Sequence, residues 1–244
     1  MATFVMIHGA WHGGWCFDAL RPTLEAAGHG IIAPDLPGMG GSDAELASTT
    51  LADWADFVAD IVRSAAQPTI LCGHSRGGIV ISEVAERVPE HISALVYICA
   101  MLLPSGMSRE ALKAVVAPNP PFNAIVKRHP SGHATVVDQA QAPSIFAQLS
   151  PPALAQAAAA RTVAEPNAPR ATPLVLTDAR YGSVPRHYIE CLCDRTIPIA
   201  DQRHMQSLQP CATVTTLEAD HSPFLSTPAA LAAALITIAQ GIEQ

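Results

Sequence analysis

The stretch PTILCGHSRGGIV at residues 68–80 decides the fold that we predict for this chain. Its first five residues predict a short buried strand, and the segment that begins at Arg76 has the spacing of a helix. A strand that runs into a helix through Gly73-His74-Ser75-Arg76-Gly77 provides the context of a nucleophile elbow. We therefore predict that Ser75 lies on a sharp turn above a sheet, at a helix N-terminus that stabilises developing negative charge.

Strands and helices continue to alternate on both sides of this stretch. Further apolar runs predict strands at residues 3–8, 30–33, 94–99, 187–192 and 212–217. Helical spacing predicts helices at residues 15–27, 51–65 and 76–87, and Thr227 followed by Pro228 predicts the start of a last helix. Continuous apolar strands that alternate with helices are typical of a parallel sheet covered on both faces. The predicted fold class is α/β, with a mostly parallel sheet of about six strands flanked by helices.

Residues 105–180 break this alternation. They hold ten prolines and short helical stretches at residues 108–117 and 152–160. A loop of this length without structure is rare in a compact domain. We therefore predict a mostly helical cap at 105–180, inserted into a single domain whose core is formed by residues 1–104 and 181–244.

A serine hydroxyl needs a base within reach, and the base needs an acid that orients it. In the predicted fold the three residues follow the order serine, acid, histidine along the chain. His221 directly follows the last predicted core strand and is the predicted base. Asp194 ends the preceding strand at the carboxyl edge of the sheet and is the predicted acid, with Asp201 as the alternative. Asp220 is interpreted as a loop residue that points away from the imidazole.

Two backbone amides are needed to stabilise the oxyanion of the reaction. The amide of Arg76 follows the nucleophile, and the amide of Ala10 lies in the glycine-rich loop after the first strand. These two amides are the predicted oxyanion hole. We expect His8 and His12 to form hydrogen bonds within that loop and His74 to be a packing neighbour.

Composition excludes several other classes of function. The chain carries 14 lysines and arginines against 21 aspartates and glutamates, with a formal net charge of −7, and its basic residues form no run. Nucleic acid is therefore not an expected partner, and neutral substrates are favoured over anions. No apolar run is long enough to span a membrane, and the first predicted strand starts at Thr3, so we expect no signal peptide and a cytoplasmic location. A homodimer is compatible with the sequence.

Several blocks of sequence together resemble one family within the α/β-hydrolase superfamily, the plant methylesterases (salicylic-acid-binding esterases) and hydroxynitrile lyases with their bacterial relatives. The blocks are FVMIHGAWHGGWCF at 4–17, APDLPGMGGSD at 33–43, GHSRGG at 73–78, RYGSVPRHYIECLCDRTIP at 180–198 and EADHSPFLSTP at 218–228. The resemblance implies an α/β-hydrolase fold with Ser75 as nucleophile, Asp194 as acid and His221 as base. It also implies Ala10 and Arg76 as oxyanion donors.

The family divides into esterases and lyases, and two positions bear on the division. One group of lyases has a threonine in the first oxyanion loop and a lysine after the catalytic histidine, and another group has an asparagine in that loop. This chain has Ala10 and Ser222 at those positions. The sequence therefore favours a serine carboxylesterase that hydrolyses a small hydrophobic ester and needs no metal or organic cofactor. Cyanohydrin cleavage and a non-catalytic small-molecule receptor are the alternatives.

Apolar side chains of the cap are the expected walls of the substrate pocket, because small-molecule sites are mostly apolar. The candidates are Phe122, Ile125, Phe146 and Leu149.

Overall fold

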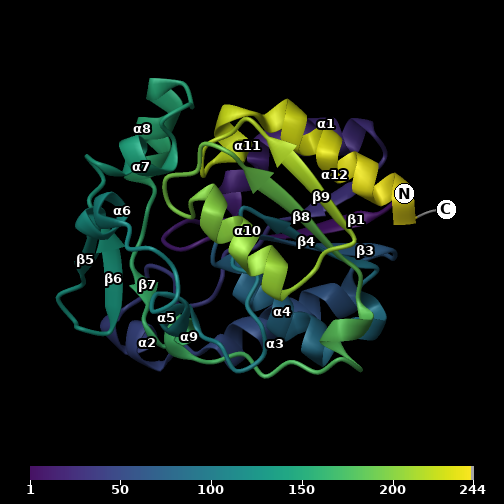
Figure 1. Cartoon of the computed structure of the whole chain (residues 1–244), viewed down its shortest axis with the longest axis horizontal. Coiled ribbons are helices and arrows are strands. Elements are labelled where there is room, and N and C mark those ends of the chain that lie inside the picture. Colours follow the sequence, from purple (N-terminus) through teal and green to yellow (C-terminus); the bar gives the residue numbers. More distant parts are fainter. Residues whose placement is uncertain (243–244) are drawn as a thin grey trace.

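A six-stranded parallel sheet forms the centre of the computed structural model, which describes residues 1–242 (Figure 1). The strand order is β2-β1-β3-β4-β8-β9, and every neighbouring pair is parallel. The predicted fold class is confirmed, and each predicted strand lies within two residues of its observed bounds. The strands are β1 (Thr3–Ile7), β2 (Gly30–Ile32), β3 (Thr69–His74), β4 (Ala94–Ile98), β8 (Arg186–Cys191) and β9 (Thr213–Leu217).

Helices cover both faces of the sheet because successive strand side chains point to opposite faces. In β1, Val5 and Ile7 belong to one apolar cluster and Phe4 and Met6 to the other. The first cluster is completed by α3 (Leu51–Ser64), α4 (Gly77–Arg87) and α10 (Ile199–Leu208). The second is completed by the 3-10 helix Gly14–Leu20, α1 (Arg21–Ala26) and α12 (Pro228–Ile242).

Local sequence signals explain how some of these helices begin. Thr50 and Asp53 form a capping box at the start of α3, in which the Asp53 amide donates to Thr50 Oγ1 over 3.2 Å and the Thr50 amide donates to Asp53 Oδ2 over 2.8 Å. The helix predicted at residues 15–27 is divided into a 3-10 helix and α1, and Pro22 stands in the first turn of α1. A proline is tolerated there because its missing N–H has no helical partner at that position. The remaining helices of the core are α2 (Asp43–Ser48), α11 (Pro223–Ser226) and the 3-10 helices Pro89–His91 and Tyr181–Ser183.

Residues 105–180, called the cap segment below, connect β4 to β8. Its helices are α5 (Arg109–Leu112), α6 (Pro120–Ile125), α7 (Ala142–Phe146), α8 (Pro152–Ala160) and α9 (Ala168–Ala171). It also contains a small antiparallel sheet of β5 (Val126–Arg128), β6 (Ala134–Val137) and β7 (Glu165–Pro166). The elements α5 to α9 lie at the end of the sheet to which the arrows of β8 and β9 point, and the chain after α9 returns to the C-terminal end of α4, where Thr177 and Arg180 donate to Glu86 (Figure 1).

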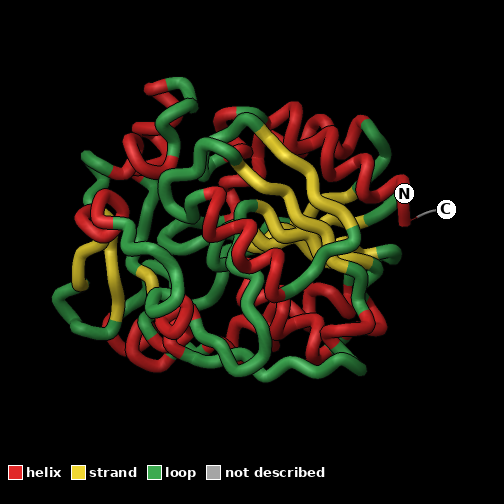
Figure 2. Tube along the Cα trace, viewed as in Figure 1, coloured by secondary structure: helices red, strands yellow, loops and turns green. Residues whose placement is uncertain are grey.

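This second sheet was not predicted from the sequence, because its strands hold only two to four residues and show no sustained alternation. Loops connect these short elements (Figure 2). No helix in the described part of the chain is long and apolar enough to cross a lipid bilayer.

Candidate active site

The turn between β3 and α4 holds Ser75 in a left-handed backbone conformation, with φ of 53°. This conformation is strained for a residue with a side chain, and such strain is concentrated at functional sites. The flanking glycines make the turn sterically feasible. A Cβ on Gly73 would lie 2.7 Å from the carbonyl carbon of Gly77, and a Cβ on Gly77 would lie 2.5 Å from the carbonyl oxygen of Ile7. The sharp elbow predicted from the sequence is therefore present in the structure.

Ser75, His221 and Asp194 form a continuous chain of hydrogen bonds. His221 Nδ1 lies 2.7 Å from Asp194 Oδ2, and His221 Nε2 lies 3.0 Å from Ser75 Oγ. An ionised carboxylate only accepts, so the ring carries its proton on Nδ1 and leaves Nε2 to accept the serine proton. All three residues are buried, which limits competition from water.

The second oxygen of Asp194 is also held. Asp194 Oδ1 accepts from the amides of Thr196 over 2.7 Å and Ile197 over 2.8 Å. These two bonds fix the carboxylate against rotation. The alternative acid, Asp201, lies on α10 and forms no hydrogen bond to His221.

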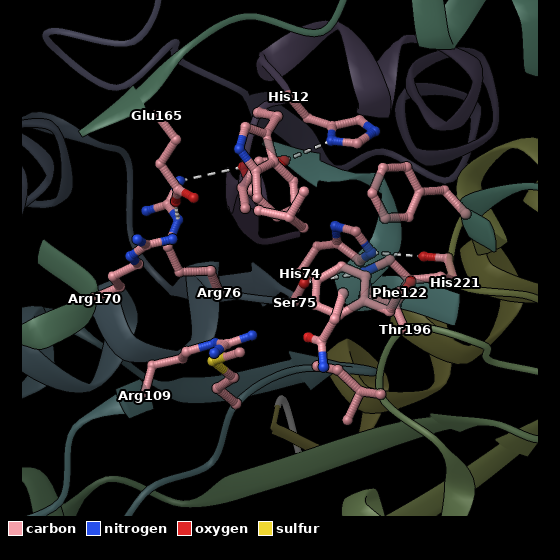
Figure 3. Close-up of a pocket in the computed structure, with 18 of the residues that line it drawn as sticks. His12, His74, Ser75, Arg76, Arg109, Phe122, Glu165, Arg170, Thr196 and His221 are labelled. Atoms are coloured by element: carbon pink, nitrogen blue, oxygen red, sulfur yellow. Dashed lines mark hydrogen bonds and ion pairs between the residues drawn. The ribbon is translucent and has the colours of Figure 1, made fainter. Parts of the chain in front are cut away.

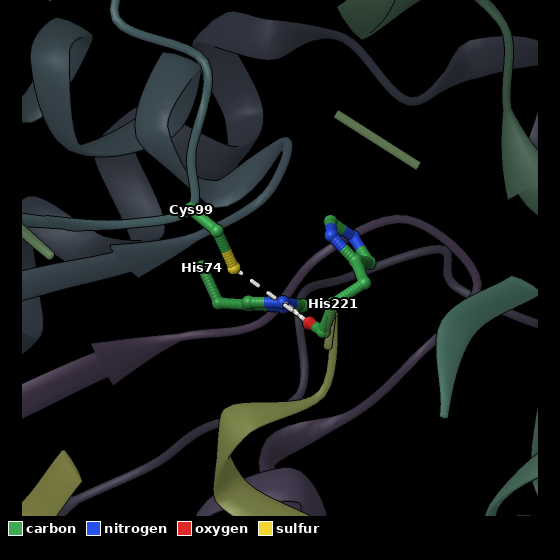
Figure 4. Close-up of side chains that lie close together, drawn as sticks. All are labelled: His74, Cys99 and His221. Carbon is green, nitrogen blue, oxygen red and sulfur yellow. Dashed lines mark hydrogen bonds between the residues drawn. The ribbon is translucent and has the colours of Figure 1, made fainter. Parts of the chain in front are cut away.

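The side chains of His74 and Cys99 contact the backbone carbonyl of His221 (Figure 4). His74 Nε2 donates to the carbonyl oxygen of His221 over 2.7 Å, and Cys99 Sγ approaches the same oxygen at 3.7 Å. The ligand atoms of these three residues lie within 4.8 Å of one another, a grouping that could suggest a metal site. Burial raises the pKa of the Cys99 thiol well above its usual value, whereas metals bind the thiolate. Because the His74 ring proton is directed at a carbonyl and both ring nitrogens of His221 are engaged, the group is a hydrogen-bonded support.

The predicted oxyanion donors both line the pocket above Ser75. Among residues 1–242, neither the amide of Ala10 nor that of Arg76 donates a hydrogen bond to a protein acceptor. Two histidines fix the loop that carries Ala10. His12 Nδ1 donates to the carbonyl of Ala10 over 2.6 Å, and His8 Nε2 accepts from the amide of Leu36 over 3.1 Å. His8 thus bonds outside the loop as well as within it, where its Nδ1 donates to Gly9 over 2.9 Å.

A cavity of about 720 Å³, its mouth included, opens above these groups (Figure 3). Trp11 closes one wall and stacks on Phe146 with ring centroids 6.0 Å apart. The apolar lining consists largely of Trp11, Met101, Phe122, Val126, Phe146 and Ile197.

Of the four cap residues predicted to line the pocket, the structure places Phe122 and Phe146 in its wall. Ile125 is outside the lining and packs in the core of the cap segment. Leu149 is 51% exposed, and its backbone amide donates to Asp220 Oδ2, which leaves the side chain at the surface. The prediction for Ile125 and Leu149 is therefore corrected, because hydrophobicity alone does not tell which side of a short helix or turn faces the cavity.

Asp220 has a larger role than the loop position that the sequence suggested. Its carboxylate is fully buried and accepts from the Leu149 amide over 2.8 Å, Ser150 Oγ over 3.3 Å, the Ser222 amide over 3.0 Å and Ser226 Oγ over 2.9 Å. It therefore connects the cap segment to the loop that carries the histidine. An aspartate followed by serines two and six residues later is a weak signal for such a network.

The side chain of Arg76 makes a second connection between elbow and cap segment. Its guanidinium forms an ion pair with Glu165 of β7, donates to the carbonyl of Gly9 over 3.2 Å, and lies 4.2 Å over the ring of Trp54. Both charged side chains are at least 96% buried. No sequence signal links Arg76 to Glu165, because the pairing arises only when the cap segment folds over the sheet.

Bacterial and plant proteins resemble this chain. A model of the alpha/beta hydrolase family matches residues 4–234. A pyrethroid hydrolase of Sphingobium wenxiniae is 33% identical over 243 residues, which cover 96% of this chain and 86% of the relative. Salicylic acid-binding protein 2 of Nicotiana tabacum is 31% identical over 252 residues, which cover 97% of this chain and 96% of the relative. The crystal structure of a pyrethroid hydrolase from Sphingobium faniae matches with a TM-score of 0.84 and 32% identity, over 98% of both chains. The resemblance found in the sequence blocks is confirmed.

Proposed function

The chain belongs to the alpha/beta hydrolase family, and from this membership we propose that it is a serine carboxylesterase in which Ser75, His221 and Asp194 are nucleophile, base and acid. The hydrogen-bonded chain from Asp194 through His221 to Ser75 carries this proposal. Relatives that are named as hydrolases and esterases support the general activity, hydrolysis of carboxylic esters.

The first half of the reaction forms an acyl-enzyme. Ser75 Oγ attacks the ester carbonyl carbon while His221 Nε2 takes the hydroxyl proton. The carbonyl oxygen becomes an oxyanion that accepts from the amides of Ala10 and Arg76. The bond from carbon to the alcohol oxygen then breaks, and His221 gives its proton to the leaving alcohol.

The second half regenerates the enzyme. Water attacks the acyl carbon while His221 Nε2 takes one of its protons, and the same two amides hold the second oxyanion. The bond to Ser75 Oγ breaks as His221 returns the proton to the serine. Asp194 keeps Nδ1 protonated and stabilises the imidazolium that forms in each half.

The proposed substrates are small esters with a hydrophobic part. The aromatic wall of Trp11, Phe122 and Phe146 supports this choice, because apolar surface buried against it contributes about 25 cal/mol per Å². Names among the relatives include methylesterases and a pyrethroid hydrolase, so both small and bulky alcohol groups belong in a test panel.

Substitution of the nucleophile and the acid tests the proposal. With a panel of short and aryl esters, Ser75→Ala is expected to lower kcat/KM by at least about 10³-fold, and Asp194→Asn by a comparable factor. Asp201→Asn is the matched control, since it removes the alternative carboxylate and is expected to retain activity. Hydrolysis that survives in Ser75→Ala, or that is lost equally in Asp201→Asn, would refute the assignment. Release of cyanide from mandelonitrile with negligible ester hydrolysis would favour a lyase instead.

A further inference from the structure

One side of the pocket is strongly basic. Its lining includes Arg76, Arg109, Lys113 and Arg170, and among residues 1–242 the only acid that lines it is Glu165. This concentration is unexpected in a chain with a net charge of −7 and only 14 basic residues. In the view of Figure 3, the three labelled arginines lie on the opposite side of Ser75 from His221.

The arginines are not fully satisfied by protein groups. Arg76 is 4% exposed, and its Nη1 has no hydrogen-bond partner within the described residues although Nη2 donates to Gly9. Arg109 is 16% exposed, and its Nη1 is likewise without a hydrogen-bond partner. A buried guanidinium N–H that lacks an acceptor is costly, so an acceptor supplied by a ligand would be strongly stabilising.

Glu110, which lies outside the pocket lining, forms ion pairs with three of these cations. The oxygens of Glu110 lie 3.8 Å from Arg109 Nη1, 3.0 Å from Lys113 Nζ and 3.5 Å from Arg170 Nε, and the side chain is 40% exposed. Glu165 is the partner of Arg76. Four cations therefore face two carboxylates, which leaves an excess of positive charge at this side of the cavity.

The charges on this side also repel one another. Burial lowers the pKa of Arg109 and the charge of Glu110 opposes this effect, while the neighbouring charge of Arg170 lowers the pKa by a smaller amount. Burial lowers the pKa of Arg76 too, against the opposing effect of Glu165. The arginines carry their charge at neutral pH in spite of this. An anion bound between them would relieve the repulsion.

We propose that the pocket selects esters that carry a second, anionic group, a carboxylate, which binds Arg109 and Arg170 beside the unpartnered Nη1 of Arg76 while the ester carbonyl lies at Ser75. The aromatic wall then contacts the hydrocarbon between the two groups. This specificity rests on the proposed esterase activity. It also revises the expectation from net charge that neutral substrates are favoured, because the local field in a cleft outweighs the average charge of the surface.

Two matched pairs of substrates test the proposal and tell which part of the ester carries the anion. The first pair compares monoethyl adipate with the ester in which the free carboxylate is replaced by an amide, so the charge is in the acyl part. The second pair compares 4-carboxyphenyl butyrate with 4-carbamoylphenyl butyrate, so the charge is in the alcohol part. In at least one pair, wild-type kcat/KM is expected to be about tenfold or more higher for the carboxylate, the gain of one charge-assisted contact. That preference is expected to fall as NaCl is raised from 20 to 500 mM.

Variants locate the preference in the protein. Arg109→Gln and Arg170→Gln are each expected to reduce the ratio of carboxylate to amide kcat/KM by about fivefold or more. Arg63→Gln is the matched control, because it removes the same charge from an exposed helix side chain outside the pocket, and the ratio is expected to stay at the wild-type value.

Three outcomes would overturn the inference. A wild-type enzyme that hydrolyses the neutral esters but shows no preference for the carboxylate in either pair leaves the esterase proposal intact and refutes this specificity. A preference for the carboxylate that persists in both Arg109→Gln and Arg170→Gln would show that these arginines do not bind the anion, which refutes the inference. A preference that does not respond to salt refutes it even if the variants do not fold. Failure of the wild type on all four esters would count instead against the esterase assignment.

Discussion

Mild acid is expected to destabilise this protein through two histidines that are buried in the oxyanion loop after β1. His8 is held in its neutral form from both sides, because its Nε2 accepts from the Leu36 amide and its Nδ1 donates to Gly9. Protonation of Nε2 would break the first hydrogen bond, because the Leu36 amide and the protonated ring nitrogen are both donors. Burial, with a contribution from the positive charge of Arg76, lowers the pKa of His8 to about 3, and burial lowers the pKa of His12 to about 4.

The sign of the effect follows from the two pKa values of each histidine. The unfolded chain binds a proton as the pH falls through about 6.5, whereas the folded protein binds it only near the lowered pKa. Between those values the unfolded state holds more protons, so the free energy of unfolding decreases as the pH falls. From pH 7 to pH 5 the loss is about 2 kcal/mol for each of His8 and His12, at 1.36 kcal/mol per pH unit once the unfolded histidine titrates. Two such losses are a large part of a typical stability of about 5–15 kcal/mol.

Urea unfolding at half-unit steps from pH 7 to pH 5, followed by tryptophan fluorescence, measures this dependence. The His8→Gln variant is expected to be less stable at every pH. Below pH 6 its free energy of unfolding is expected to depend on pH less steeply than that of the wild type, by about 1.36 kcal/mol per pH unit. His204→Gln, at an exposed position on α10, is the matched control and is expected to keep the wild-type slope. A wild-type unfolding free energy that is flat between pH 7 and pH 5, or a slope unchanged in His8→Gln, would refute the reasoning.

Two further substitutions test how the elbow and the histidine loop are supported. Gly73→Ala places a Cβ against backbone atoms of Gly77 and is expected to cost about 2–3 kcal/mol in urea unfolding and most of the esterase activity, whereas Gly30→Ala, whose Cβ would meet nothing closer than 3.5 Å, serves as control; equal effects of the two would contradict the steric argument. Asp220→Ala leaves three buried or partly buried donors without an acceptor, since Ser226 Oγ also donates to the carbonyl of Ser222, and it is expected to lower the free energy of unfolding by at least about 3 kcal/mol. A loss no larger than that of exposed Asp18→Ala would contradict this expectation.

The core of the fold was predictable because its signals are local. The parallel strands hold three to six residues, and β1, β3 and β4 contain short buried apolar runs that mark them in the sequence. The turns and caps between strands contain glycine, proline and threonine at positions that those residues favour. The cap segment was less predictable. Its strands are short, and the side of α6 or of the turn at Leu149 that faces the cavity is set by contacts with distant parts of the chain.

The candidate site divides in the same way. The motif around Ser75 and the order of acid and histidine along the chain allowed Ser75, Asp194 and His221 to be proposed before any geometry was known. Neither the pairing of Arg76 with Glu165 nor the bonds of Asp220 to Leu149 and Ser150 have a comparable signal, because each contact joins two segments whose separation in the sequence carries no information about it.

By itself, the sequence determined the α/β class, the strained turn at Ser75 and the residue types available for nucleophilic chemistry, since backbone conformation and hydrophobic periodicity are properties of neighbouring residues. Only the tertiary structure decided that four basic side chains, one from the turn before α4 and three from the cap segment, share one side of the cavity. Electrostatic fields depend on distance through space and on burial from water, and the average charge of a chain therefore does not reveal the charge of its pocket.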